Sequence, residues 1–177
     1  MRSVVASRCI LEPQVKEHAA EMFRVLGDPA LYEFENEPPQ SQQYLTARYE
    51  RLESRESADG KERWLNWVIR LPSGNLAGYV QATVLQSGIA YVAYELNSQH
   101  WRQGIGSSAV RVMLEELCTK YGVHAFVAVF KAKNFRSEAL LHSLGFSLGS
   151  AEQHALYQDE PDELVMVREA GHVQNAA

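Results

Sequence analysis

The chain has 177 residues, of which 46% are hydrophobic and 22% are charged, and its formal net charge is −5. This length suits one domain with a sizeable core, and we assign residues 1–177 to a single domain. The acidic balance disfavours a protein that binds nucleic acid through phosphate contacts. No stretch approaches the roughly 20 apolar residues that a membrane span needs.

The N-terminal segment and the two cysteines indicate the setting of the protein. Residues Met1 to Leu11 contain no long apolar run, so we expect no signal peptide. The surroundings of Cys9 and Cys118 suggest neither a disulfide framework nor a metal site. No spacing elsewhere suggests metal ligands. We therefore expect a reducing, cytoplasmic setting with no metal and with neither nucleic acid nor membrane as a partner.

A short strand and two helices are predicted first. The strand covers Arg8 to Leu11 and is stopped by Pro13. A helix begins at Val15, because apolar residues then recur at the spacing of one helical face, at Ala19, Met22, Phe23 and Leu26. Ser41 can cap a second helix. The apolar side of that helix carries Tyr44, Leu45, Tyr49 and Leu52.

Three strands follow at short intervals. They cover residues 64–70, 76–85 and 89–96, and turn residues rich in Gly, Ser and Pro separate them. Tight turns between consecutive strands imply antiparallel pairing, so we expect a meander.

The pattern changes in the second half of the chain. A helix is predicted over Ser107 to Tyr121, followed by a near-continuous apolar strand over His124 to Phe130. A strand, a helix and a strand in this order suggest a parallel crossover. Asn134 caps another helix that ends at Leu144, and final strands are predicted over 146–148 and 164–167. The fold class is therefore α/β (α+β mixed sheet), with an antiparallel meander, a parallel βαβ crossover and flanking helices.

The segment Trp101–Ala109 joins a strand to a helix and contains two glycines. Gly104 and Gly106 remove side chains where the backbone turns sharply or approaches a ligand. Free N–H groups at the start of the helix make an anion site that can cradle a pyrophosphate. Arg102 can add a charge-assisted contact to a phosphate. A plain glycine-containing loop remains the alternative.

The same glycines also fit the fingerprint of dinucleotide-binding folds, Gly-x-Gly-x-x-Ala. That fingerprint needs glycine directly after the strand, whereas residues 97–103 separate this strand from Gly104. The strand that follows the helix ends in lysines, Lys131 and Lys133, rather than in an acidic residue. A phosphate-binding P-loop is excluded because no Gly-Lys-Ser/Thr is present.

Arg102-Gln103-Gly104-Ile105-Gly106 resembles the acetyl-CoA pyrophosphate loop of the GNAT superfamily of N-acetyltransferases, Arg/Gln-x-x-Gly-x-Gly/Ala. Trp101 stands at the first position of that pattern, where the family usually has Arg or Gln. A tryptophan at this position is similar to the subgroup that includes the ribosomal-protein N-terminal acetyltransferases (RimJ/RimL-like). Asn134-x-x-Ser137 with Leu144-Gly145-Phe146 resembles a second segment of the subgroup. A third, diffuse likeness comprises Arg8 to Pro13, Asp28-Pro29 and Gly78.

The resemblance implies a fold in which the strands 91–96 and 125–129 splay apart in a V. The pantetheine arm of acetyl-CoA would lie in the V beside Glu95, Leu96 and Asn97, and its pyrophosphate on the N–H groups of 102–107. The residues implied in binding acetyl-CoA are Leu96, Asn97, Arg102, Gln103, Gly104, Ile105, Gly106, Ser107, Ser108, Asn134 and Ser137.

The implied reaction is direct attack of an amine on the thioester. A backbone N–H near Leu96 would hold the carbonyl oxygen. Ser137 would protonate the leaving thiolate, or is an ordinary first-turn serine. Glu95 would be the base, or a solvent-side residue of the sheet. Leu141 stands where many family members carry a tyrosine acid, and Tyr91 where subgroup members often carry an acid.

Three carboxylates, Glu33, Glu35 and Glu37, alternate with aromatic residues in an irregular segment. In this family that segment shapes the acceptor cleft, and the carboxylates can attract a cationic amine or form a solvated loop. The acceptor is then a primary amine, either a peptide N-terminus or a small molecule. A non-catalytic acyl-CoA sensor is the alternative function, and the oligomeric state, a homodimer included, stays open.

Overall fold

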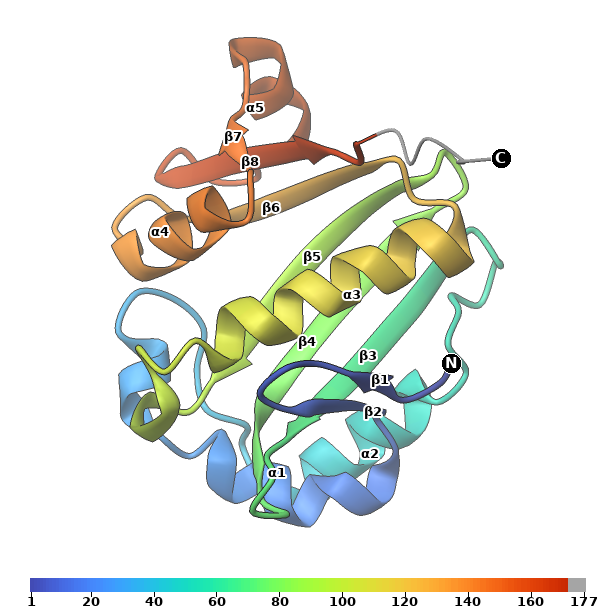
Figure 1. Cartoon of the computed structure of the whole chain (residues 1–177), viewed down its shortest axis with the longest axis vertical. Coiled ribbons are helices and arrows are strands. Elements are labelled where there is room, and N and C mark those ends of the chain that lie inside the picture. The colour runs from blue at the N-terminus through green and yellow to red at the C-terminus, as the bar shows by residue number, and fades with distance from the viewer. Residues whose placement is uncertain (172–177) are drawn as a thin grey trace.

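The computed structural model describes residues 1–171 and contains a mixed sheet with helices on both faces (Figure 1). The strands are β1 Val4–Val5, β2 Ile10–Pro13, β3 Glu62–Arg70, β4 Leu76–Leu85, β5 Ile89–Leu96, β6 Ala125–Lys131, β7 Ser147–Leu148 and β8 Glu163–Glu169. The α-helices are α1 Ala19–Val25, α2 Gln42–Leu52, α3 Ile105–Tyr121, α4 Phe135–Ser143 and α5 Ala151–Tyr157. Short 3-10 helices are η1 Lys16–His18, η2 Pro29–Tyr32 and η3 Ser98–His100. Residues 172–177 lie outside the described part, and the assignment of 1–177 to one domain stays a prediction.

The strands follow the order β1-β2-β3-β4-β5-β6-β8-β7. β3, β4 and β5 form the antiparallel meander that the turn residues predicted. β5 and β6 run parallel, with α3 as the crossover, and β8 returns antiparallel to β6. The predicted mixed fold is therefore confirmed.

The first strands differ from the prediction of one strand over Arg8 to Leu11. β2 begins at Ile10 and continues through Pro13, and β1 precedes it. Proline does not stop β2, because β1 pairs only with Ile10 and Leu11. The missing N–H of Pro13 therefore falls on an edge where no partner strand needs it.

The helices also differ at their starts. The first predicted helix begins as the 3-10 turn η1 and becomes α-helical only at Ala19. α3 begins at Ile105 rather than at Ser107, because Gly104 takes a left-handed φ of 72° and caps it. Helix α5 was not predicted, although Ser150 and Gln153 form a capping box that marks its start.

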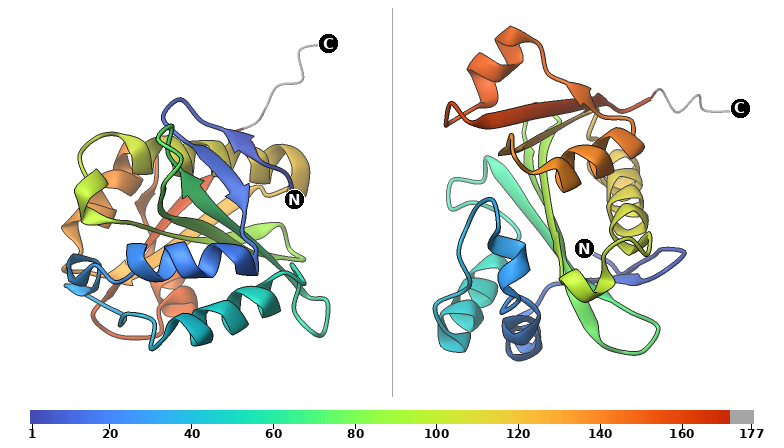
Figure 2. Two further views of the ribbon diagram at one scale, coloured as in Figure 1. Left: turned by 90° about the horizontal axis from the view of Figure 1, so that it is seen from below. Right: turned by 90° about the vertical axis from the view of Figure 1, so that its left-hand side faces the viewer.

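Helices cover opposite faces of the sheet (Figure 2), and an apolar core lies beneath them on each face. The larger core packs α3 and α4 against one face, through residues such as Val110, Met113 and Leu141. The smaller core packs α1 and α2 on the other face, through residues such as Met22 and Leu45. We call these the α3 face and the α2 face. Within residues 1–171, no helix has the length and apolar character needed to cross a bilayer.

β5 and β6 part soon after they meet. They pair only from Ile89–Ala125 to Tyr91–Val127, and β6 stays paired with β8 as far as Lys131. The remaining half of β5, up to Leu96, therefore has β4 on one side and a gap on the other. This is the V that the family resemblance implied, and Figure 1 shows α4 beside its open end.

A bulge in β4 lies opposite the open end of the V. Ile69 pairs with Gly78 and Arg70 with Leu76, so Ala77 is an extra residue on β4. A Cβ atom at Gly78 would lie 2.0 Å from the carbonyl oxygen of Glu95. Only glycine therefore lets β4 approach the end of β5 this closely.

We predict that Gly78→Ala destabilises the protein, because its methyl group must displace the backbone of Glu95. Such overpacking costs about 1–3 kcal/mol, which lowers the Tm of a chain of this size by several degrees. Thermal denaturation checks this. Gly27→Ala is the control, since its Cβ would lie at an ordinary contact distance of 3.4 Å from two carbonyl oxygens. Equal Tm values for both variants would contradict the prediction.

Candidate active site

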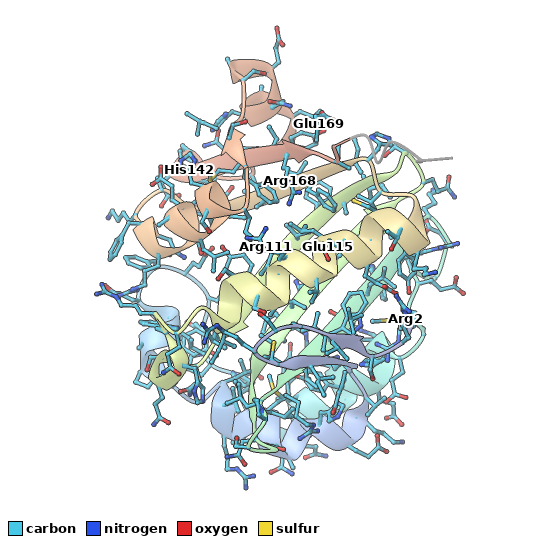
Figure 3. All side chains as sticks on the ribbon, in the orientation of Figure 1. Arg2, Arg111, Glu115, His142, Arg168 and Glu169 are labelled. Carbon is cyan, nitrogen blue, oxygen red and sulfur yellow. The ribbon has the colours of Figure 1, made fainter. Side chains whose placement is uncertain are left out.

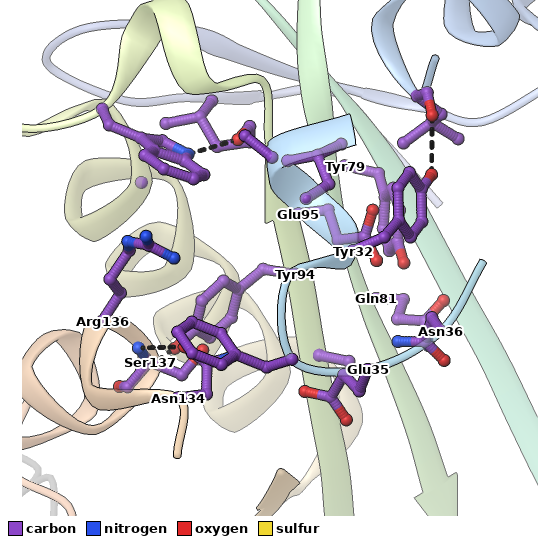
Figure 4. Close-up of a pocket in the computed structure, with 18 of the residues that line it drawn as sticks. Tyr32, Glu35, Asn36, Tyr79, Gln81, Tyr94, Glu95, Asn134, Arg136 and Ser137 are labelled. Carbon is purple, nitrogen blue, oxygen red and sulfur yellow. Dashed lines mark hydrogen bonds between the residues drawn. The ribbon is translucent and has the colours of Figure 1, made fainter. Parts of the chain in front are cut away.

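A cavity of about 1140 Å³ occupies the gap where β5 and β6 part (Figure 4). Part of its lining lies on the α3 face, where the loop before α3 contributes residues such as Trp101 and Gly104, and α4 contributes residues such as Ser137. The rest lies on the α2 face, where the segment 30–40, α2 and the strands β4 and β5 contribute. A cavity that reaches both faces allows two substrates to meet from opposite sides of the sheet.

The end of β5 presents backbone groups to this cavity. Asn97 donates its N–H to the carbonyl oxygen of Ala77 on β4, at 2.8 Å. Successive residues of a strand direct their N–H and C=O groups to opposite edges, so those of Leu96 point into the V. The Leu96 carbonyl accepts a hydrogen bond from the indole Nε1 of Trp101 at 2.5 Å.

The loop before α3 turns through two left-handed residues, Arg102 with φ 57° and Gly104 with φ 72°. The turn leads into the N-terminus of the 17-residue helix α3, whose first amides lack partners within the helix. A Cβ atom at Gly106 would lie 3.2 Å from Cδ1 of Leu140, so glycine lets α3 lie close to α4. Residues of this loop in the cavity lining are Arg102, Gly104, Ile105, Gly106 and Ser107. The arrangement suits a bound anion.

Three residues that the resemblance implied in acetyl-CoA binding lie outside the cavity lining: Asn97, Gln103 and Ser108. The amide of Asn97 donates to the Val25 carbonyl at 3.0 Å. That of Gln103 donates to the Gln99 carbonyl at 2.9 Å. The hydroxyl of Ser108 pairs with a serine hydroxyl of the N-terminal hairpin at 2.9 Å. These polar side chains brace the loop, and a role of the three residues in binding acetyl-CoA, through their backbone groups, stays a prediction.

Asn134 and Ser137 come together at the start of α4. Oδ1 of Asn134 accepts a hydrogen bond from the Ser137 N–H at 3.1 Å, as expected of a helix cap. Both residues line the cavity. The hydroxyl of Tyr94, on β5, donates to the Ser137 carbonyl oxygen at 3.3 Å. Leu141, at the position of the absent tyrosine acid, is buried in the core instead.

Glu95 lines the cavity from the α2 face of the sheet, beside Tyr79, its cross-strand partner (Figure 4). Burial raises the pKa of Glu95 to about 7, with a smaller contribution from the charge of Glu35. Hydrogen bonding to Tyr79 and the charge of Arg48 oppose the rise in this pKa. A carboxylate that titrates near neutral pH in a cavity has the property of a general base.

The three glutamates of the irregular segment have separate environments. Glu33 forms an ion pair with Arg136, with Oε2 and Nη2 2.5 Å apart. Glu35 and Glu37 line the cavity. Burial raises the pKa of Glu35, while Asn134 and Lys131 lower it. The segment therefore contributes to the cavity wall through Glu35 and Glu37, while Glu33 and Glu37 are also exposed to solvent.

Arg136 connects three segments around the cavity. Its guanidinium carbon lies 4.6 Å from the ring centroid of Trp101, 5.1 Å from that of Phe34 and 5.0 Å from that of Phe135. Together with the Glu33 ion pair, these contacts join α4 to the loop before α3 and to the segment 30–40. We call Glu33, Phe34, Trp101, Phe135 and Arg136 the arginine bridge. Arg136 was not expected from the sequence, because Glu33, Phe34 and Trp101 lie far from it in the chain.

Other lining residues of the α2 face were also missed: Gln14, Arg48, Tyr79 and Gln81. Tyr79 and Gln81 alternate along β4, so the period of the strand placed them on one face. Nothing in the sequence showed that this face borders the cavity. Burial raises the pKa of the Tyr79 hydroxyl well above its ordinary value, so the hydroxyl stays protonated.

Comparisons with known proteins agree with this geometry. The acetyltransferase (GNAT) domain family matches residues 8–147. RimL, a ribosomal-protein α-N acetyltransferase solved in complex with coenzyme A, superimposes with a TM-score of 0.78 at 16% identity, covering 94% of this chain and 96% of RimL. RimJ of Mycobacterium smegmatis, in complex with CoA-disulfide, gives 0.75 at 21% identity, covering 97% and 89%. Ribosomal-protein-S5-alanine acetyltransferase from Vibrio fischeri gives 0.78 at 16% identity, covering 96% and 97%. A search of curated protein sequences returned no match.

The chain belongs to the GNAT family of acetyltransferases, because the family match spans most of its length. Membership makes the chain an acetyltransferase with acetyl-CoA as its co-substrate. At identities of 16% and 21%, the solved structures establish the likeness of the fold alone.

We predict that Arg136→Met loosens the segment 30–40. Each cation–π contact at an exposed site contributes about 0.5–1 kcal/mol, so losing the arginine bridge raises the open population of the segment about tenfold. A glutamate-specific protease, which cuts after Glu33 and Glu35, measures this population through the rate of cleavage under native conditions.

The matched control is Arg111→Met, because Arg111 lies exposed on the outward face of α3 (Figure 3). Its cleavage rate should equal that of the wild type. Equal rates for Arg136→Met and Arg111→Met would show that the arginine bridge does not hold the segment.

Proposed function

We propose that this acetyltransferase acts on the α-amino group of a peptide or protein N-terminus, with acetyl-CoA on the α3 face and the acceptor on the α2 face. One observation carries the proposal. Glu95, with a pKa near 7, lines the acceptor side of the cavity next in the chain to Leu96, whose N–H points into the V. A base and an oxyanion donor thus flank one point of the gap.

The proposed site for acetyl-CoA uses the loop before α3 for the pyrophosphate. The first amides of α3 supply N–H donors and the positive end of the helix dipole. Arg102 lines the cavity beside them and adds a guanidinium. The pantetheine arm would lie in the gap along the free edge of β5, between Leu96 and the start of α4, where Asn134 and Ser137 line the cavity.

The proposed reaction transfers one acetyl group and one proton. Glu95 accepts a proton from the acceptor ammonium, and the free amine attacks the thioester carbonyl carbon, forming the C–N bond. The N–H of Leu96 donates to the oxyanion of the tetrahedral intermediate. The nitrogen, positively charged after the attack, releases its second proton to solvent. Collapse then breaks the C–S bond, and the thiolate takes a proton from the Ser137 hydroxyl, which solvent replaces. The Tyr94 hydroxyl, whose pKa burial raises to about 12, lies beside Ser137 as a protonated neighbour.

The pKa of Glu95 favours an α-amine over an alkylamine. An N-terminal ammonium has a pKa of about 8, and a lysine-like ammonium one of about 10.4. Transfer of a proton from an N-terminal ammonium to a carboxylate of pKa about 7 therefore costs about 1.4 kcal/mol. The same transfer from a lysine-like ammonium costs over three times as much. An α-amine is thus the acceptor that this base deprotonates at neutral pH.

The rim of the cavity and the relatives also support a peptide acceptor. Phe135 and Tyr44 line the cavity and are 57% and 49% exposed, so apolar rings stand where a peptide side chain would pack. RimL and the Vibrio fischeri protein are acetyltransferases of ribosomal proteins. An acceptor of that kind would place the activity in the cytoplasm, as we propose.

The decisive experiment is turnover of acetyl-CoA against peptides and small amines, followed by release of free thiol and by the mass of the product. We expect acetylated peptide N-termini and little transfer to a polyamine. Acetyl-CoA binding without turnover on any amine would reject the proposal and favour a sensor.

We predict that kcat/KM for a peptide rises with pH through about 7, because Glu95 accepts a proton only when ionised. Glu95→Gln should abolish this rise and lower kcat/KM about 100-fold at pH 8. A pH profile of both enzymes on one peptide measures the effect. The inflection of the acceptor amine, about one unit higher, should remain in both.

The control for that profile is Glu115→Gln, an exposed glutamate of α3 far from the cavity lining (Figure 3). It should keep the wild-type profile. An unchanged inflection near 7 in Glu95→Gln would assign the base to another group.

We also predict that Gly106→Val weakens acetyl-CoA binding at least about tenfold, because its side chain drives into Leu140 and separates α3 from α4. Calorimetry measures the Kd directly. Gly171→Val is the control, since a Cβ atom there meets nothing within 4 Å. An unchanged Kd in Gly106→Val would contradict the proposed place of the pyrophosphate.

A further inference from the structure

Three carboxamide side chains stand in a row across the α2 face of the sheet. The Gln14 N–H donates to the Asn66 carbonyl at 2.9 Å, Asn66 pairs with Gln81, and Gln81 pairs with Ala93. Cross-strand partners place their side chains on one face, and Ala93 shares its face with Glu95, two residues along β5. We call Gln14, Asn66 and Gln81 the amide row.

The fold does not account for the amide row. Gln14 is 3% exposed and Asn66 is 5% exposed, although buried carboxamides are costly unless they are hydrogen-bonded. Nε2 of Gln14 has no hydrogen-bond partner among residues 1–171. The carbonyl of Gln14 accepts a hydrogen bond from the Arg55 guanidinium, so its main chain is fixed by other groups. The Nε2 group of Gln14 is therefore a buried donor that the described residues leave unpaired.

The cavity that contains Glu95 reaches this row. Gln14 and Gln81 belong to its lining, and α2 provides the facing wall through Leu45, Arg48, Tyr49 and Leu52. Three strand spacings of about 4.8 Å separate β5 from Gln14, which makes about 14 Å. An extended peptide covers about 3.4 Å per residue, so about four residues span the distance.

The chemistry of the row suits a peptide backbone. A carboxamide both donates and accepts hydrogen bonds, as a peptide group does. A polyamine offers only donors and positive charge, for which carboxylates are the better partners. The row carries no charge, so it discriminates between these two kinds of acceptor.

We propose that the amide row is a second subsite of the acceptor channel, which hydrogen-bonds the backbone of a peptide acceptor at about its third or fourth residue. The inference rests on the proposed function, because it takes the acceptor amine to lie at Glu95. The peptide then runs from the gap across β4 and beneath α2, with the Gln14 carboxamide at the far end.

The test compares amidated peptides that share one N-terminal residue and contain two to five residues. In the wild type, kcat/KM should rise about tenfold between the dipeptide and the tetrapeptide, the value of about one hydrogen bond. In Gln14→Met, the ratio of tetrapeptide to dipeptide should fall to about one. Gln81→Met, on β4, provides a second variant with the same expectation in case the first does not fold.

Gln43→Met is the matched control, because Gln43 is an exposed residue of α2 outside the cavity lining. It should keep the wild-type ratio. Acetyl-CoA affinity, measured by calorimetry, reports whether each variant is folded, since that site is built on the loop before α3 and on α4.

The outcomes separate this inference from the proposed function. Turnover of peptides without any length dependence in the wild type, or with a wild-type length dependence in both folded variants, would overturn the amide row as a subsite. Failure of the wild type to acetylate any peptide, with acetyl-CoA bound, would overturn the proposed function and this inference with it. A length dependence that the two variants lose and the control keeps would support both.

Discussion

The parting of β5 from β6 after Tyr91 is the constraint on which the site depends. A continuous sheet would consume the N–H and C=O groups of Leu96 in a ladder, and would close the passage between the two faces. Because β8 still pairs with β6 and β4 still pairs with β5, the gap leaves few backbone N–H and C=O groups without a hydrogen-bond partner. Gly78 and the extra residue Ala77 allow β4 to follow β5 to its end.

The open V places opposite electrostatic environments on the two faces of one sheet. On the α3 face, the start of α3 and Arg102 favour an anion. On the α2 face, Glu35, Glu37 and Glu95 favour a cation. The burial that raises the pKa of Glu95 results from the same wall of tyrosines and helix α2 that encloses the acceptor side. In the proposed reaction, the negatively charged donor and the positively charged acceptor therefore approach from opposite sides and meet at Leu96.

The arginine bridge relates the two sides to each other. Trp101 belongs to the loop before α3, whereas Glu33 and Phe34 belong to the segment 30–40, and Arg136 contacts all three. Trp101 also donates to the Leu96 carbonyl, so the same ring contacts the reactive end of β5. The proposed site thus has a rigid part, the sheet, and a part held by contacts among segments distant in the chain.

The sequence by itself determined the order of the elements, the meander, the crossover and the glycine loop. These features depend on local periodicity and turn residues, and β4 and β5 match their predicted bounds residue by residue. The family resemblance supplied the V, and it pointed to Glu95, Asn134 and Ser137, which the structure places in the cavity lining. The three-dimensional arrangement was needed to show that Glu95 lines the cavity from the α2 face, that the side chains of Asn97, Gln103 and Ser108 brace the loop, and that Arg136 joins three segments. It alone aligned Gln14, Asn66 and Gln81. The physical reason is that strand register, loop paths and burial bring together side chains whose separation in the chain carries no signal.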